Sequence, residues 1–534
     1  MKMGYIFEEL IRKFSENAEA GDHYTGRDII KLMVNILLAE GCDDIFDDGK
    51  VITILDQACG TGGMLSTGYN FIKRYNPSAD VRLFGQEINP ESYAMCLAEM
   101  LIKGQNAENI CYQDTMKADR FKGTKMRFVL ENPPFGTAWG GKDAAEGVED
   151  AVNAEYQKGV DGRWGAGLPG SGDMQMLFLQ SAIDKMDDNF GRAAIIENGS
   201  PLFSGGTASG ESQIRRWMLE SDLIEAIIAL PTDLFYNTGI ATYIWVLSKN
   251  KRPERKGKIQ LIDASTFFKK LRKALGDKKN EISPEDRSAV TKLYADFAEN
   301  EYCKIYRNEE FIYREYTVMQ PLQRSYAITE ERIQAMVGKG ALDSLYNEVK
   351  FADLELMEER DGKAQKQLNK FFVGKPIYDA ILADLNHAIS DTVWMSPDAF
   401  MPHLTEVLSK ATTDKKLLEK IADGLSVMDK GAEIQRDRKG NIIYDKETKD
   451  IELVKWEESI EDYMAREVLP HIPDAAAFFE ENLGAKKPVI KTGAEIPFTR
   501  YFYKYQQPTA SEELEVRFMD LERSVSDYVA KLFE

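Results

Sequence analysis

The sequence predicts an α/β protein built around a doubly wound, mostly parallel β-sheet, and three observations support this fold class. From residue 51 onward, short apolar segments alternate with longer segments of helical periodicity, which is typical of a parallel sheet with helices on both faces. A loop of small residues at 56–63 joins the first predicted strand to a helix, and an Asn-Pro-Pro-Phe sequence at 132–135 directly follows another strand. We also expect a short helical segment before the sheet and a mainly helical region after it.

The chain before the sheet, residues 1–45, is expected to be a short helical segment. Residues 5–14 and 28–38 carry apolar side chains at helical spacing. Between these two helices lies a polar turn, which includes Asp22, His23, Tyr24, Thr25, Gly26 and Arg27. His23 taken alone is more typical of a surface or capping residue than of a ligand.

The sheet and its helices are expected over residues 46–265. The predicted strands are 51–55, 81–84, 110–112, 126–130, 193–197, 223–230, 243–247 and 259–262, and the predicted helices are 64–75, 91–102, 174–186 and 214–219. In open sheets of this kind, ligands bind at the carboxyl ends of the strands. We therefore expect the functional site along that edge.

The interval 136–172 lacks clear periodicity and is long for a connection inside a compact domain, which favours a functional loop. Two interpretations stay open: residues 163–170 close over a bound base, or the interval is a mobile surface insertion.

Residues 266–534 are expected to be mainly helical and to contact a partner subunit or DNA. Ser283 and Pro284 indicate a helix start, with serine as the cap and proline at the first helical position. Residues 437–450 are interpreted as a hairpin or a loose connection. Apolar residues at 514–532 repeat as in a heptad seam, which packs on the chain's own domain or docks on a partner's helices. A cationic cluster in this region allows two interpretations: it contacts DNA phosphates, or it is an ordinary solvated face. Its residues are Lys269, Lys270, Arg272, Lys273, Lys278 and Lys279.

Composition limits the partners that this chain can bind alone. Its 534 residues suit two or three globular domains, and 68 Lys+Arg against 88 Asp+Glu give a net charge of −20. This charge opposes non-specific DNA binding, which depends on cationic contacts to phosphates. If DNA is the substrate, a partner must therefore supply much of the binding affinity. Five scattered cysteines indicate neither a disulfide framework nor a zinc site. We expect a cytoplasmic location without membrane contact, since no long apolar run or signal-peptide pattern appears.

The candidate catalytic residues are Asn132, Pro133, Pro134 and Phe135. The prolines cannot continue the strand, so Asn132 and Phe135 are held at its carboxyl end. Hydrogen bonds accepted by the Asn132 side-chain oxygen and the Pro133 carbonyl would draw the lone pair of a planar amine, such as that of adenine, out of ring conjugation. Phe135 would stack on the base. The alternative is a turn with a buried phenylalanine.

A second group of residues predicts a nucleoside pocket. Glu87, at the end of the second strand, is placed to accept hydrogen bonds from ribose hydroxyls, and Asp114 follows the third strand, where it could receive an adenine amino group. No Lys-Ser/Thr pair follows the glycines, which argues against a phosphate cradle. A nucleoside without polyphosphate fits better, and S-adenosyl-L-methionine is the common one. Cys59 is interpreted as a packing residue, and the remaining candidates in the loop are Asp56, Ala58, Gly60, Thr61, Gly62 and Gly63.

With these motifs in this order, the chain resembles the modification (M) subunits of type I restriction-modification systems, which are N6-adenine DNA methyltransferases. The likeness includes residues 58–65, 85–90, 230–240 and 262–265, and Tyr24-Thr25 looks like the family's N-terminal cofactor motif. It covers roughly residues 5–265 strongly and the tail loosely. The resemblance implies a Rossmann-like methyltransferase domain with a seven-stranded sheet.

The resemblance also implies an activity and partners. A methyl group would pass from S-adenosyl-L-methionine to adenine in double-stranded DNA, with the target base flipped out of the helix. A specificity (S) subunit would read the sequence in a complex of two M subunits with one S subunit, and a restriction (R) subunit is possible. Three departures stand out: the helical region that usually precedes the first motif is nearly missing, and Gly26 and Gln57 replace the usual prolines. We expect these two changes to loosen the turns around the cofactor.

Two other functions stay open. A protein methyltransferase acting on a glutamine amide also uses an Asn-Pro-Pro-aromatic sequence, although the long tail and the loop at 136–172 favour DNA. A catalytically silent scaffold for the specificity subunit is the other, and the presence of Asn132 and Glu87 argues against it.

Overall fold

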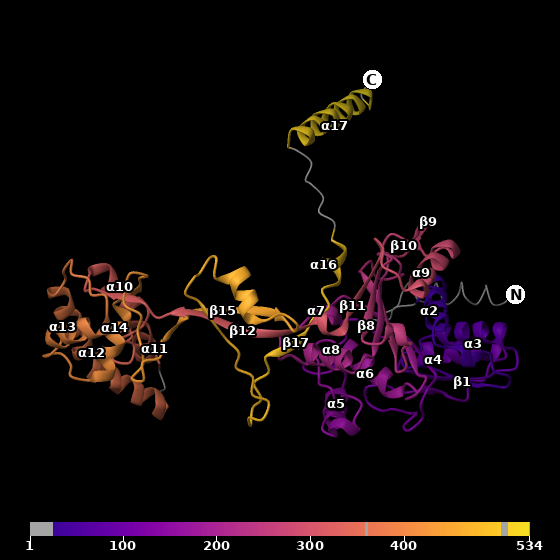
Figure 1. Cartoon of the computed structure of the whole chain (residues 1–534), viewed down its shortest axis with the longest axis horizontal. Helices are drawn as coiled ribbons and strands as arrows, with labels where there is room; N and C mark the ends of the chain where they lie inside the picture. Colours follow the sequence, from indigo (N-terminus) through magenta and orange to yellow (C-terminus); the bar gives the residue numbers. More distant parts are fainter. Residues whose placement is uncertain (1–24, 358–360, 504–510, 533–534) are drawn as a thin grey trace. The chain divides into compact units, whose positions relative to one another are not determined.

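The computed structural model describes residues 25–357, 361–503 and 511–532, which form two compact units (Figure 1). Unit 1 comprises Met1–Arg314, Lys455–Glu457 and Glu481–Glu534, and unit 2 comprises Glu315–Val454 and Glu458–Glu480. The predicted helix at 5–14 and the candidate residues Asp22, His23 and Tyr24 lie outside the described residues. The division into segments 1–45, 46–265 and 266–534 stays a prediction.

Unit 1 is built on a nine-stranded sheet with the order β11-β8-β6-β7-β5-β4-β1-β2-β3. Its strands are β1 (Val51–Asp56), β2 (Asp80–Glu87), β3 (Ile110–Tyr112), β4 (Phe128–Glu131), β5 (Arg192–Asn198), β6 (Ile224–Ala229), β7 (Thr242–Ser248), β8 (Lys258–Asp263) and β11 (Cys303–Arg307). Neighbouring strands pair in parallel, except that β7 runs antiparallel between β5 and β6 and β11 runs antiparallel at the edge beside β8. The mostly parallel sheet is confirmed, but it has nine strands rather than seven.

Helices cover both faces of this sheet, so the doubly wound prediction is confirmed. Among the described residues of unit 1, the helices are α2 (Arg27–Ala39), α3 (Gly63–Tyr75), α4 (Pro90–Ile102), α5 (Val148–Tyr156), α6 (Gln175–Lys185), α7 (Ser200–Phe203), α8 (Gly210–Glu220), α9 (Pro284–Asp296), α16 (Phe498–Phe502) and α17 (Ser511–Leu532). Successive strand residues point to opposite faces: Leu130 of β4 packs in a cluster with α2, α3 and α9, whereas Val129 packs with α6 and α8. Two hydrophobic cores therefore enclose the sheet.

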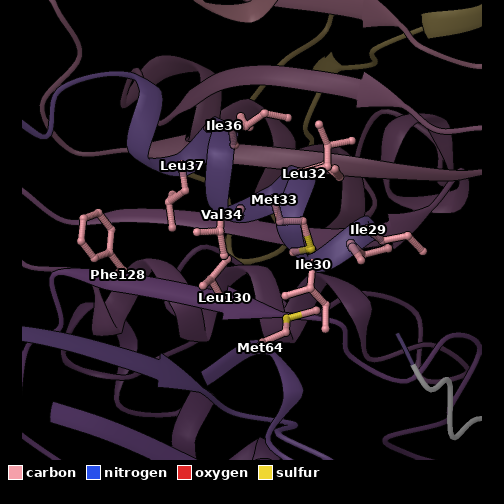
Figure 2. Close-up of a cluster of buried hydrophobic side chains, with 14 of the residues drawn as sticks. Ile29, Ile30, Leu32, Met33, Val34, Ile36, Leu37, Met64, Phe128 and Leu130 are labelled. Carbon is pink, nitrogen blue, oxygen red and sulfur yellow. The ribbon is translucent and has the colours of Figure 1, made fainter. Parts of the chain in front are cut away.

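The helix α2 shows why the chain folds this way near the predicted site. Its apolar residues recur at helical spacing, and seven of its thirteen residues are buried, so the helix is stabilised mainly by packing. Figure 2 shows this cluster, in which the side chains of α2 lie with Met64 of α3 and with Phe128 and Leu130 of β4. Gly26 directly precedes this helix as its N-cap residue.

Residues 266–534 are expected to be mainly helical, but the first segment beyond residue 265 is a pair of strands. Residues Lys269–Leu275 and Lys278–Glu281 form the antiparallel strands β9 and β10 of a hairpin. Helix α9 then starts as predicted, with a capping box in which the Ser283 side chain accepts from the Asp286 backbone N–H. The seam at the end of the chain is helical in α17, where Leu514, Phe518, Leu521 and Val525 are exposed.

Unit 2 is largely helical around its own core, as expected for this part of the chain. Its helices are α10 (Glu330–Gly338), α11 (Glu348–Leu356), α12 (Gly362–His387), α13 (Pro397–Val407), α14 (Lys415–Gly424) and α15 (Ile460–Tyr463). Its strands are β13 (Arg324–Tyr326), β14 (Ser426–Met428), β15 (Tyr444–Lys455), which ends at the unit boundary, and β16 (Ala476–Phe478). The strand β12 (Ile312–Pro321) pairs with β17 (Thr492–Ala494) in unit 1 and with β16 in unit 2.

Candidate active site

The structure brings the ends of β1 and β4 and the loop after β1 together around one pocket at the carboxyl edge of the sheet. The empty space in this pocket, open solvent included, is about 360 Å³. It is lined by Thr25, Ile30, Asp56, Ala58, Cys59, Gly60, Thr61, Gly63, Met64 and Asn132. No lysine or arginine is among these residues, so the described lining contains acidic, small and apolar groups with one amide.

Asp56 is a buried carboxyl group at the floor of this site. Its side chain is 2% exposed, and its Oδ1 accepts a hydrogen bond from the Ala58 backbone N–H at 3.1 Å. Burial, and to a smaller extent the charge of Glu87, raise the pKa of Asp56 to about 8 against the lowering effect of that hydrogen bond. A ligand that donates hydrogen bonds or carries positive charge would lower this pKa again.

Glu87 holds the glycine loop to the end of β2. Its two carboxylate oxygens accept from the backbone N–H groups of Gly60 and Asn89, each at 2.7 Å. Gly60 and Gly62 have φ values of +51° and +79°, a left-handed conformation that residues with a Cβ rarely adopt. A Cβ on Gly62 would also lie 2.7 Å from Cys96 Sγ. The loop therefore requires glycine at Gly62 for its conformation and for its packing.

Asn132 meets the segment before α2, which is more than a hundred residues away in the chain. Its Nδ2 donates a hydrogen bond to Thr25 Oγ1 at 2.8 Å, and both residues line the pocket. With the nitrogen directed at Thr25, the side-chain oxygen is the atom that could accept from a ligand. The structure thus links one member of the predicted cofactor turn directly to the predicted catalytic amide.

Phe135 is buried and packs against another aromatic ring. Its side chain is 8% exposed and contacts Phe235 edge to face, with ring centroids 6.3 Å apart. Pro133 is buried and Pro134 half-buried, and neither of the two belongs to the pocket lining. The role of Phe135 as a stacking face for a base stays a prediction.

Three other candidates lie away from the pocket lining. Asp114 Oδ1 accepts from the Met116 backbone N–H at 2.8 Å in the turn after β3. Gly26 precedes α2, and an Arg27 guanidinium nitrogen lies 3.9 Å from a carboxylate oxygen of Glu99 on α4. The roles of these three residues in cofactor binding stay predictions.

Several residues at the site were not candidates from the sequence. Ile30 and Met64 line the pocket, and each belongs to the apolar stripe of its helix, so no local signal separates them from core residues. Glu131 directly precedes the predicted catalytic residues and is fully buried. Burial, and then the charge of Asp56, raise the pKa of Glu131 well above its usual range. Glu197 on β5 shows the same burial and the same direction of pKa shift.

Part of the interval 136–172 packs against the rest of unit 1. It contains α5, and Trp139 and Trp164 lie with residues of α6 in a small hydrophobic cluster. Arg163 donates to the Thr115 carbonyl at 2.7 Å and to the Met116 carbonyl at 3.2 Å. Because Trp164 is fully buried, its movement over a base would require this cluster to open.

Comparison with known proteins matches the chain to one family. The model of the N-6 DNA methylase family matches residues 2–332. The MjaVII methylase subunit of the type I restriction enzyme from Methanocaldococcus jannaschii is 31% identical over 50% of this chain and 43% of its own length. The HindI methylase subunit from Haemophilus influenzae is 29% identical over 49% of this chain and 54% of its own length.

A solved structure is also similar. The methyltransferase subunit of a type I restriction-modification system from Streptococcus thermophilus is 27% identical, with a TM-score of 0.47, over 57% of this chain and 59% of that one. The chain spans about half the length of the curated relatives it matches.

Proposed function

The chain belongs to the N-6 DNA methylase family, and from this premise we propose that it transfers the methyl group of S-adenosyl-L-methionine to the N6 amino group of adenine in double-stranded DNA. The observation that carries the proposal is the meeting of the glycine loop and Asn132 in one pocket. A methyl donor held by the loop would lie next to an amine held by the amide. Proximity and orientation of this kind supply most of the catalysis for such a transfer.

The lining residues fit S-adenosyl-L-methionine better than a nucleotide with phosphates. Asp56 lines the pocket, Glu87 lies behind it on the Gly60 backbone N–H, and the described lining contains no cation, so a phosphate chain would find no positive partner. A sulfonium cation and ribose hydroxyls suit carboxylates. When bound, this cofactor supplies an electrophilic methyl group that needs no metal.

The target adenine would be held by Asn132 and Pro133. The Asn132 side-chain oxygen and the Pro133 carbonyl would accept hydrogen bonds from the N6 amine, which localises its lone pair for attack. Thr25 fixes the amide by accepting from its nitrogen at 2.8 Å. Because the amine is inaccessible within stacked DNA, the base must be flipped into the pocket.

We propose that the chain works with a specificity subunit that reads the DNA sequence, in a complex of two modification subunits with one specificity subunit, and that a restriction subunit can join it. The relatives carry the name methylase subunit of type I restriction enzymes. A net charge of −20 also opposes strong DNA binding by the chain alone. Among the described residues, no helix is long and apolar enough to cross a bilayer.

The test is methyl transfer from labelled S-adenosyl-L-methionine, by the chain alone and with its specificity partner. The substrates are adenine-containing duplex DNA and, separately, proteins with exposed glutamines. We expect labelled adenine in the duplex, in the presence of the partner, and no labelled glutamine. Label in glutamine, or equal transfer to DNA with and without the partner, would contradict the proposal.

A further inference from the structure

A cationic ribbon, the β9–β10 hairpin of residues 269–281, lies in unit 1 near α2 and α9 (Figure 1). It carries five exposed cations within eleven residues of a chain whose net charge is −20: Lys269, Lys270, Arg272, Lys273 and Lys279. Lys269 and Lys279 lie 3.3 Å from carboxylates of Glu285 and Asp233, respectively. Within the described parts of the chain, Lys270, Arg272 and Lys273 make no ion pair.

The ribbon is fixed to the loop that follows β6. The backbone N–H groups of Lys279 and Asn280 donate to the Asp233 carbonyl at 2.9 and 3.1 Å, and the Asp277 N–H donates to the Tyr236 carbonyl at 2.8 Å. The Asn280 side chain adds a hydrogen bond to the carbonyl of Thr232 at 2.9 Å. The cations therefore stand on a hydrogen-bonded scaffold and not on a loose loop.

This scaffold connects to both sides of the proposed adenine site. The buried Lys278 Nζ donates to Asp28 Oδ2 at 3.0 Å and to the Leu234 carbonyl at 2.9 Å. Asp28 lies three residues after Thr25, whose hydroxyl accepts from Asn132. On the other side, Phe235 follows Leu234 and packs on Phe135. The ribbon is thus hydrogen-bonded to the segment that carries Thr25, the partner of Asn132, and to the segment that carries Phe235, the partner of Phe135.

We propose that the cationic ribbon grips the backbone phosphates of the DNA strand that presents the flipped adenine, through Lys270, Arg272 and Lys273. This inference rests on the proposed function. Base flipping requires the backbone beside the target to be held, and phosphate contacts position DNA without reading sequence. A net charge of −20 opposes the approach of DNA, so a group of cations without ion pairs, on a hairpin that is hydrogen-bonded to the segment after Thr25, is complementary to the strand that must approach the pocket.

The experiment compares two triple variants of the chain in complex with its specificity partner. One replaces the ribbon cations: Lys270→Gln, Arg272→Gln and Lys273→Gln. The matched control removes three exposed cations from α14 in unit 2: Lys415→Gln, Lys416→Gln and Lys420→Gln. For each, the dissociation constant of a duplex is measured by fluorescence anisotropy over a range of salt concentrations, together with that of S-adenosyl-L-methionine.

The ribbon variant should bind duplex at least tenfold more weakly. Each lost phosphate contact should reduce the slope of log affinity against log salt by about 0.9, with S-adenosyl-L-methionine affinity unchanged. The control should keep the wild-type slope. An unchanged slope in the ribbon variant, or an equal loss of duplex affinity in the control, would overturn the ribbon proposal. The proposed function would still stand if the wild-type complex methylates adenine. A wild-type complex that binds duplex but methylates no adenine would instead remove the proposed function and this inference with it.

Discussion

Replacing Thr25 with valine tests whether a hydrogen bond from outside residues 132–135 positions the proposed catalytic amide of Asn132. Asn132 Nδ2 lies 2.8 Å from Thr25 Oγ1, and the Asn132 oxygen is the proposed acceptor for the adenine amine. The bond on the nitrogen side therefore fixes the direction of the oxygen. Valine has nearly the shape of threonine but lacks the oxygen, so the substitution removes the acceptor and leaves the packing of α2 close to its original state.

The size of the effect follows from the burial of this contact. Thr25 is 8% exposed, so bulk water does not readily replace its hydroxyl. Depriving a fully buried donor of its partner costs about 1–3 kcal/mol, and this partly buried hydrogen bond falls in the lower part of that range, at about 1–2 kcal/mol. If this cost falls on the reactive orientation of the amide, kcat falls about 5- to 30-fold.

The assay measures kcat for methyl transfer to duplex DNA at saturating cofactor, and the dissociation constant of S-adenosyl-L-methionine by calorimetry. Thr25→Ser is the control, because serine keeps the hydroxyl and should keep most of the activity. We expect the valine variant to lose kcat while its cofactor affinity stays close to wild type. Wild-type kcat in the valine variant, or a loss confined to cofactor affinity, would refute the positioning role.

Three further predictions concern the loop, the buried carboxyl and the core. Gly62→Ala should abolish measurable cofactor binding in a calorimetric titration, because it adds a steric clash to an unfavourable φ. Gly60→Ala should weaken binding less, because the space around its Cβ is open. Equal effects of the two substitutions would contradict the packing argument. Burial raises the pKa of Glu131 in the folded protein, so the wild-type protein loses stability as the pH rises from about 4, the pKa of glutamate in the unfolded chain, toward the pKa in the folded chain. Glu131→Gln should therefore raise the thermal midpoint at pH 8 more than at pH 5. A difference in midpoint that does not depend on pH would count against this reasoning. Arg192 donates to both carboxylate oxygens of Glu225 in the core at 3.0 and 2.9 Å, so Arg192→Met should lower the free energy of unfolding in urea by about 3–5 kcal/mol, and an unchanged denaturation midpoint would show that the pair adds little.

Much of the sheet could be predicted because its strands are short apolar runs bounded by turns. Residues 51–55 and 81–84 fall inside β1 and β2, and the polar residues after them lie at one edge because parallel strands end there. The β9–β10 hairpin could not be predicted in this way. Leu271 and Leu275 are four residues apart among lysines and an arginine, which is the spacing of a charged helix. The hairpin is held by hydrogen bonds to Asp233 and Tyr236, which are distant in sequence.

The site was predictable where a residue type is required by local chemistry and less so where tertiary contacts decide. The glycine loop and Asn132 are such requirements, and the structure places both at the pocket. The pairing of Asn132 with Thr25 and of Phe135 with Phe235 depends on how α2 and the loop after β6 pack, and no periodicity in the sequence reports that. The burial of Glu131 is similar, because a glutamate at a strand end is usually exposed.

The most direct test of the account is the identity of the methylated nucleoside. Duplex DNA is incubated with S-adenosyl-L-methionine and the chain in complex with its specificity partner, then digested to nucleosides and analysed by mass spectrometry, with Asn132→Ala in parallel. The account predicts N6-methyldeoxyadenosine from the wild-type chain and none above background from the Asn132→Ala variant. Methylcytosine as the product, or undiminished N6-methyladenine from the Asn132→Ala variant, would contradict it.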